Sequence, residues 1–430
     1  MLNRAQQPAI QPLSELHLPL PERRQLHNGI PITIVQLGNQ ELVRLDILFR
    51  AGIWCQSQKL QALFTNRMLR EGTQSFTAKE IAERLDYYGA WLELSCGAMY
   101  SCISLYSLSR NFTQTLDILQ SMILEPIFDE DKLETVKEMN VQQFLINQDR
   151  VDFLAHRNLL NALLGDTHPY GKRTQREDYE AIHKELLHSY FEEHFHSGNC
   201  HIFISGDATA ANVEAVDQVF GREPFGQVER GATVCEPPVF TPDPAPRRFL
   251  EKADACQSAI CMGMPTLMRE HADYHKFRVV LSIFGGYFGS RLVSNIREEK
   301  GYTYYIGADM LHYPFSSFLL IHTECDNQYV EPLIQEVYAE MDRLQTEEVS
   351  PEELQQVKSY MIGELCRNYE SAFAIADAWM FAFTSDLDDE YFQRSLEGIK
   401  NTSAADILDL AQRYLRKEEL KVSIAGEQIK

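Results

Sequence analysis

Residues 237–246 have the sequence PPVFTPDPAP and hold five of the 17 prolines in this chain of 430 residues. Proline fixes φ and lacks a backbone donor, so this density excludes a helix and favours an extended connector. Because the stretch lies near the middle of the chain, it predicts two domains of similar length. We expect a first domain at 1–225, a linker at 226–246 and a second domain at 247–430.

The two halves that flank this stretch share one order of strand-like and helix-like segments. In each half, strands precede a helix with apolar residues at helical spacing, a longer helix follows, and a strand closes the half. The longer helices start alike: when Lys132–Lys137 is aligned with Glu353–Lys358, a Leu and a Lys fall at the same positions. The closing strands at 201–207 and 420–427 also correspond. A duplicated α+β unit accounts for this order.

The charge balance and the cysteine pattern exclude several classes of protein. With 40 Lys and Arg against 62 Asp and Glu, the net charge of -22 opposes contact with nucleic-acid phosphates. The nine cysteines form no C-x-x-C pair, which is typical of a reducing compartment. No window of eighteen apolar residues occurs, and residues 1–20 lack the apolar core of a signal peptide. We therefore expect a cytoplasmic protein without nucleic-acid or membrane partners.

Four segments in this order resemble the pitrilysin, insulinase and mitochondrial processing peptidase family. They are MLREGTQSFTAKEIAERLDYYGA (68–90), HPYGKRTQREDYEAI (168–182), SYFEEHFHSGNCHIFISGD (189–207) and FGGYFGSRLVSNIREEKGYTY (284–304). The resemblance implies an α+β fold of two homologous domains, each a mostly antiparallel sheet packed with helices. It also implies zinc-dependent peptide hydrolysis at an inverted motif, H-x-x-E-H. Two histidines at i and i+4 share a helix face and bind one zinc ion, while the Glu acts as general base.

The positions that correspond to this motif carry none of its functional groups. Counting back from Gly72, they hold Leu63, Asn66 and Arg67 in place of the two histidines and the base. The further Glu ligand of the family corresponds to Gln143, or to Gln142 if the register differs by one. Neither an aliphatic group nor a guanidinium ligates zinc, and an amide cannot take up a proton at neutral pH. We expect a degenerate motif, no metal in this chain and no peptide hydrolysis by this chain alone.

The second half keeps two residue types that the family uses for substrate binding. Family members carry an Arg and a Tyr that hold the substrate opposite the zinc, and the matching residues here are Arg297 and Tyr304. Such donors can stabilise a developing oxyanion. Spacing alone favours a solvated cation at a helix end and a half-buried strand aromatic, whereas the match of the surrounding segment to the family favours the substrate-binding role.

A second group of possible metal ligands lies at 183–196, with His188 and Glu192 one helical turn apart. No zinc-binding motif accompanies this group, so we expect ordinary partnered or exposed histidines.

These observations favour a non-catalytic subunit of a heterodimeric zinc metallopeptidase. A homologous partner would supply the zinc site, and this chain would contribute substrate binding and transition-state positioning for a peptide. The alternative is a structural or interaction protein of the same fold without a peptidase role. A homodimer that binds peptides without cleaving them is a further possibility.

Overall fold

The computed structural model describes residues 18–38 and 40–428. The prediction about a signal peptide falls almost wholly on residues outside this range. None of the helices in the described part of the chain is long and apolar enough to cross a membrane.

The first half forms a six-stranded sheet in the order β1-β2-β6-β3-β5-β4. Only β2 and β6 pair in parallel, and the other neighbours are antiparallel. The central strand β3 is almost wholly buried, whereas the edge strand β4 alternates exposed and half-buried residues. The strands are β1 (Glu22–Gln25), β2 (Pro31–Gln36), β3 (Leu42–Phe49), β4 (Trp91–Cys96), β5 (Ser101–Leu108) and β6 (Cys200–Gly206).

The second half repeats this sheet with five strands in the order β7-β11-β8-β10-β9. Here β7 and β11 form the parallel pair, which corresponds to β2 and β6 of the first sheet. The equivalent order and the equivalent parallel pair confirm the prediction of a duplicated α+β unit with mostly antiparallel sheets. The strands are β7 (Arg247–Glu251), β8 (Gln257–Pro265), β9 (Thr303–Tyr313), β10 (Ser316–Asp326) and β11 (Lys421–Gly426).

Helices cover both sheets, and several begin where the sequence carries a cap. Helix α2, for example, starts at a capping box between Thr77 and Glu80 and ends at Gly89, whose φ is 64°. The helices of the first half are α1 (Gln61–Met68), α2 (Ala78–Tyr88), α3 (Phe112–Leu124), α4 (Glu130–Gln148), α5 (Val151–Leu164), α6 (Arg176–Glu180), α7 (Lys184–His194) and α8 (Ala210–Val216). Those of the second half are α9 (Tyr274–Leu281), α10 (Val330–Thr346), α11 (Pro351–Asn368), α12 (Ala372–Thr384), α13 (Tyr391–Asn401) and α14 (Ala404–Tyr414).

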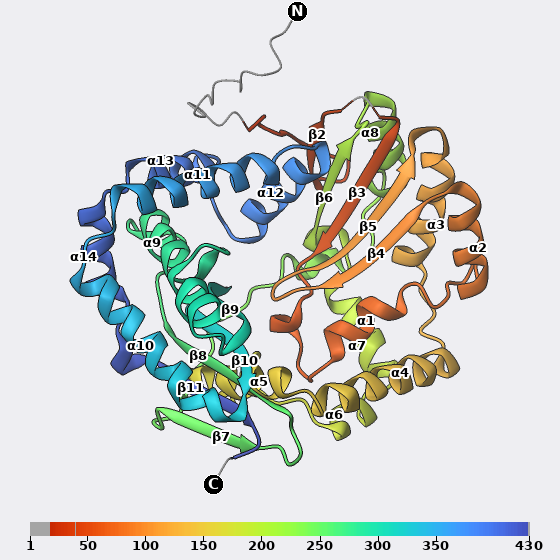
Figure 1. Ribbon diagram of the computed structural model, residues 1–430. Coiled ribbons are helices and arrows are strands. Elements are labelled where there is room, and N and C mark those ends of the chain that lie inside the picture. The colour runs from red at the N-terminus through yellow and green to blue at the C-terminus, as the bar shows by residue number, and fades with distance from the viewer. Residues whose placement is uncertain (1–17, 39, 429–430) are drawn as a thin grey trace, which may run out of the picture.

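The two halves exchange one helix each (Figure 1). Helix α5 of the first half packs on β8 and β11 of the second sheet, and α12 of the second half packs on β6 and β2 of the first sheet. Because α5 and α12 occupy the same place in the two repeats, the exchange is reciprocal. It explains why one apolar cluster joins Val35, Leu48 and Phe203 of the first sheet to the helices of the second half.

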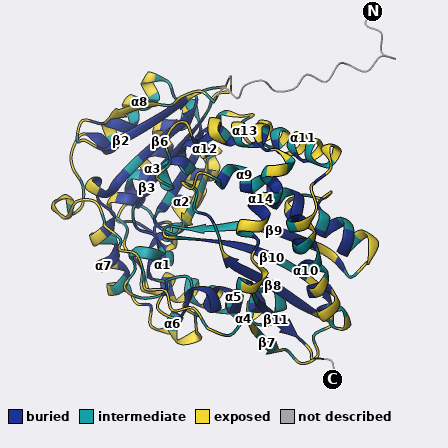
Figure 2. Ribbon diagram, turned by 90° about the vertical axis from the view of Figure 1, so that its left-hand side faces the viewer, coloured by how far each residue is buried: buried dark blue, intermediate teal, exposed yellow. Residues whose placement is uncertain are grey.

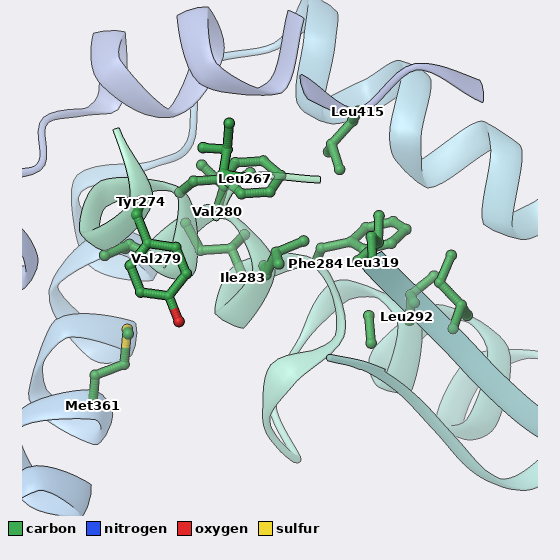
Figure 3. Packing of buried hydrophobic residues seen from close by; sticks show 14 of the residues in the cluster. Leu267, Tyr274, Val279, Val280, Ile283, Phe284, Leu292, Leu319, Met361 and Leu415 are labelled. Carbon is green, nitrogen blue, oxygen red and sulfur yellow. The ribbon is translucent and has the colours of Figure 1, made fainter. Parts of the chain in front are cut away.

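Buried residues concentrate on the sheets and on the inner faces of the helices (Figure 2). Figure 3 shows part of the largest cluster, which includes Val280, Phe284 and Leu319 of the second half. A second cluster fills the space between the first sheet and its own helices. The smaller third cluster lies where α5 meets the second sheet.

The segment predicted as a linker contains one short 3-10 turn, Val228–Arg230, and no strand. Its proline-rich part runs along the end of α5. The backbone N–H groups of Thr241 and Asp243 donate to the carbonyl oxygens of Leu164 and Ala162 at 3.2 and 2.9 Å. The connector is therefore attached to the exchanged helix as well as to the two halves it joins.

Candidate functional site

Helix α1 carries Leu63, Asn66 and Arg67, the three positions of the degenerate motif. Asn66 is only 1% exposed, and neither its Oδ1 nor its Nδ2 has a hydrogen-bond partner in the described part of the chain. The guanidinium of Arg67 donates to Oδ1 of Asn140 on α4. Burial lowers the pKa of Arg67 from its usual value.

Gln143, the predicted counterpart of the remaining zinc ligand, also lies on α4. Its side chain is exposed, and its Nε2 donates to Oδ1 of Asn147 on the same helix at 3.1 Å. The alternative position, Gln142, is exposed as well. The structure brings α1 and α4 into contact, but the contact with Arg67 comes from Asn140, one turn before Gln143. Sequence reasoning missed Asn140, although its spacing from Gln143 puts both on one helix face.

The side chains at this place do not suit a zinc ion. Leu63 offers no lone pair, Asn66 offers a neutral amide, and Arg67 brings a positive charge that opposes a cation. No group of three or more His, Cys, Asp or Glu suited to a metal ion occurs within residues 18–38 and 40–428.

His188 and His194 of the second candidate group have separate partners, whereas His196 departs from the prediction: it is buried, and neither of its ring nitrogens has a hydrogen-bond partner among the described residues. His188 pairs with Glu192 at 3.6 Å, and Nδ1 of His194 lies 3.0 Å from Oγ1 of Thr233. Burial lowers the pKa of His194 and of His196, which keeps both neutral near pH 7.

Arg297 and Tyr304, the predicted substrate-binding pair, lie in contact with each other. Arg297 belongs to a π-helical turn, Val293–Glu299, and Tyr304 to the edge strand β9. The guanidinium carbon of Arg297 lies 5.3 Å from the ring centroid of Tyr304 and 4.6 Å from that of Phe288. Both rings are largely exposed, Tyr304 to 87%. Sequence reasoning missed Phe288, although it stands inside the quoted run 284–304.

Buried hydrogen bonds fix the turn that presents Arg297. Nδ2 of Asn295 donates to Glu340 at 2.6 Å and to Glu336 at 3.0 Å. The hydroxyl of Thr303 donates to the carbonyl oxygen of Glu324 at 2.6 Å and so anchors the start of β9. No ion pair joins Arg297 to a carboxylate among the described residues, so its charge is not neutralised within that part of the chain. The cluster can therefore offer a cation and a phenol to an external anion or carbonyl oxygen.

Fold and site together define a two-domain α+β protein whose predicted motif positions carry no zinc ligands. Residues 181–361 match the family model described as "Peptidase M16 inactive domain". Over 354 residues the chain is 23% identical to "Uncharacterized zinc protease YmxG" of Bacillus subtilis, covering 81% of this chain and 85% of that protein. Over 373 residues it is 23% identical to "Non-peptidase homolog YmxG" of Helicobacter pylori, covering 85% and 84%.

Solved structures share the fold over nearly the whole chain. The M16 inactive domain from Pseudomonas fluorescens superposes with a TM-score of 0.83 at 20% identity, covering 95% of this chain and 98% of that one. A protease from Helicobacter pylori superposes with a TM-score of 0.85 at 15% identity, covering 95% and 100%. The resemblance indicated by the four sequence segments is confirmed: residues 181–361 match the M16 inactive-domain model, and the chain shares the fold of these solved structures.

Proposed function

We propose that this chain is the non-catalytic subunit of a two-chain zinc peptidase. A homologous partner supplies the zinc site, and this chain supplies Arg297 and Tyr304 to bind the peptide substrate. The observation that carries the proposal is the contrast between the two halves. The motif positions on α1 carry no zinc-ligating side chain, whereas Arg297 and Tyr304 form an outward-facing cluster to which residues 18–38 and 40–428 contribute no neutralising carboxylate.

The chemistry of the cluster suits a peptide carbonyl. A guanidinium in contact with two aromatic rings keeps its donors oriented, and the phenol adds one more donor. Donors that are positioned before the reaction stabilise an oxyanion more than they stabilise the ground state. The cluster contains no nucleophile or general base, which is why a second chain is part of the proposal.

Activity of a mixture tests the proposal. The purified chain is combined with a purified homologue that carries an intact H-x-x-E-H motif, and cleavage of an internally quenched fluorogenic peptide is followed. We expect cleavage by the mixture that neither chain shows alone. Changing Arg297→Ala should lower kcat/KM of the mixture by about 10²–10³-fold, as loss of an oxyanion donor does, and Tyr304→Phe by about tenfold.

Matched variants elsewhere control for changes in surface and stability. Arg84→Ala removes a guanidinium that lies 4.4 Å from the ring of Phe76, and Tyr87→Phe removes a phenol that is 83% exposed. Both should leave the activity of the mixture unchanged. If Arg297→Ala behaves like Arg84→Ala, the substrate-binding role is wrong. If the two chains associate in analytical ultracentrifugation without any gain in cleavage, the result favours the alternative, an interaction protein of the same fold.

A further inference from the structure

Two cysteines from distant parts of the chain meet beside the linker. Cys55 ends a 3-10 turn, Ile53–Cys55, that follows β3, and Cys235 lies in the connector between the halves. Their Sγ atoms are 3.2 Å apart, although the residues are 180 positions apart in sequence. All nine cysteines fall in the described part of the chain, and no other two of them are in such contact.

The backbone on both sides of this pair is held in place. The N–H of Cys55 donates to the carbonyl oxygen of Gly52 at 3.0 Å. Next to it, Nε1 of Trp54 donates to the carbonyl oxygen of Glu236 at 3.1 Å, which joins the turn directly to the linker. Two residues before Cys235, the N–H of Thr233 donates to Oδ1 of Asn199 at 2.9 Å. The two thiols therefore meet through an ordered framework.

The surroundings make one of the two thiols reactive. A hydrogen bond with Cys55 and the nearby guanidinium of Arg50 lower the pKa of Cys235 to about 7, despite partial burial. Cys55 has the opposite shift, since the same hydrogen bond raises its pKa. The thiolate is the form that reacts with peroxides, so the lowered pKa favours Cys235 as the attacking group and Cys55 as the resolving thiol. Both side chains are partly exposed, which leaves access for a small oxidant.

We propose that Cys55 and Cys235 form a reversible disulfide when the protein meets hydrogen peroxide or an organic hydroperoxide. The covalent bond ties the linker to the turn that leads into α1. This modification site does not depend on the proposed peptidase role.

The reaction balances in two steps. The Cys235 thiolate attacks one peroxide oxygen, the O–O bond breaks, and Cys235 becomes a sulfenic acid while the second oxygen leaves as water after taking up a proton. The Cys55 sulfur then attacks the sulfenic sulfur, the S–O bond breaks, and the hydroxyl leaves as a second water with the Cys55 proton. Two thiols and one hydrogen peroxide thus yield one disulfide and two waters, with two electrons passing to the peroxide. A dithiol reductant reverses the bond.

Peptide mapping of the full chain tests the proposal. The protein is treated with hydrogen peroxide, free thiols are alkylated, and the digest is analysed by mass spectrometry without reduction. We expect a linked peptide pair containing Cys55 and Cys235, and seven alkylated thiols, because nine less two remain. Dithiothreitol should restore all nine. The disulfide should also raise the midpoint of thermal unfolding, because it closes a long loop.

Single variants separate the two roles. Cys55→Ser should leave Cys235 as a sulfenic acid that dimedone traps, whereas Cys235→Ser should slow the oxidation of Cys55. The rate of disulfide formation should fall as the pH drops below about 7, and Arg50→Gln should move this midpoint upward. Cys366→Ser, which removes an exposed thiol elsewhere, should change neither the linked pair nor its pH dependence. The proposal is overturned if peroxide oxidises Cys256 or Cys366 while Cys55 and Cys235 remain reduced.

Discussion

The side chain of Asn66 lacks the acid–base chemistry that a zinc peptidase needs at this position. The residue stands at the position that the sequence predicts for the general base of the family, and its amide, of similar shape, cannot take up a proton. Its amide is buried with neither polar atom paired in the described part of the chain. A buried polar group without a partner costs about 1–3 kcal/mol, so the protein retains a destabilising residue at this position.

Replacing Asn66 with an apolar residue should therefore stabilise the protein. We expect Asn66→Leu to raise the free energy of unfolding by about 1 kcal/mol, measured by urea denaturation. Asn161 is the matched control, because it is equally well buried at 4% exposure but donates to Asp166 and Gly171. Asn161→Leu should destabilise. An equal loss of unfolding free energy in both variants would show that the amide of Asn66 has hydrogen-bond partners in solution.

The carboxyl group of Asp406 should make the free energy of unfolding depend on pH in the acid range. Desolvation raises its pKa, but hydrogen bonds from Lys276 and Ser403 outweigh that effect and lower the pKa to about 2. A carboxyl whose pKa is lower in the folded state stabilises the protein above its unfolded value of about 4, and this contribution is lost as the pH falls towards 2. Asp406→Asn should therefore reduce stability at pH 7 and weaken its decline between pH 4 and 2. Urea denaturation across this range checks both.

The neighbouring Asp409 provides the control for this experiment. It lies on the same helix and pairs with Arg413 at 3.1 Å, with its side chain mostly exposed. Exposed pairs contribute little to stability, so Asp409→Asn should leave the acid profile close to that of the unchanged protein. If the acid profile of Asp409→Asn shifts as much as that of Asp406→Asn, the change in stability comes from net charge and not from the hydrogen bonds of Asp406.

At the scale of secondary-structure elements, the exchange of α5 and α12 is the feature that holds the halves together. Asp377 of α12 pairs with Arg44 of β3 at 2.5 Å, and Arg44 also pairs with the buried Asp46 at 2.8 Å. On the other side, Gly263 of β8 leaves room for α5. A Cβ there would lie 3.1 Å from Leu159 and 3.2 Å from Leu163.

A larger residue at position 263 should push α5 away from the second sheet. We expect Gly263→Val to lower the free energy of unfolding by about 1–3 kcal/mol through overpacking, measured by urea denaturation. Gly363 on α11 is the control, since a Cβ there would meet nothing within 4 Å. Gly363→Ala should stabilise by about 0.5–1 kcal/mol, because alanine favours a helix interior. A neutral Gly263→Val would mean that α5 does not pack tightly on β8.

At the scale of the whole molecule, the exchange predicts that the two sheets unfold together. Each sheet depends on a helix from the other half, and the largest apolar cluster spans both. Native-state hydrogen exchange over a series of urea concentrations should give amides of β3 and β8 the same highest free energy of opening. Asp377→Ala should lower both values equally. Earlier loss of protection in β8 than in β3 would show that the halves unfold separately.

Local patterns were sufficient for much of the fold. The helix at 78–88 and the strand at 257–265 are examples, because each lies on a stretch that combines a regular apolar pattern with clear end signals. The chemistry of the motif positions also needs no structure, since Leu63 and Arg67 cannot ligate zinc in any conformation. Local patterns do not predict where α5 and α12 pack. Helix α12 is nevertheless apolar nearly all round, as expected for a helix between two layers.

The sequence does not predict contacts between residues that are far apart in the chain. The partner of Arg67 is Asn140, a second ring beside Arg297 is that of Phe288, and Cys55 lies against Cys235. Periodicity and spacing report the faces of one element, whereas these pairs depend on how elements from separate segments pack. The sequence alone therefore determines that the side chains on α1 cannot ligate zinc. Only tertiary packing decides the reciprocal helix exchange, because each sheet has an apolar face that its own half leaves uncovered.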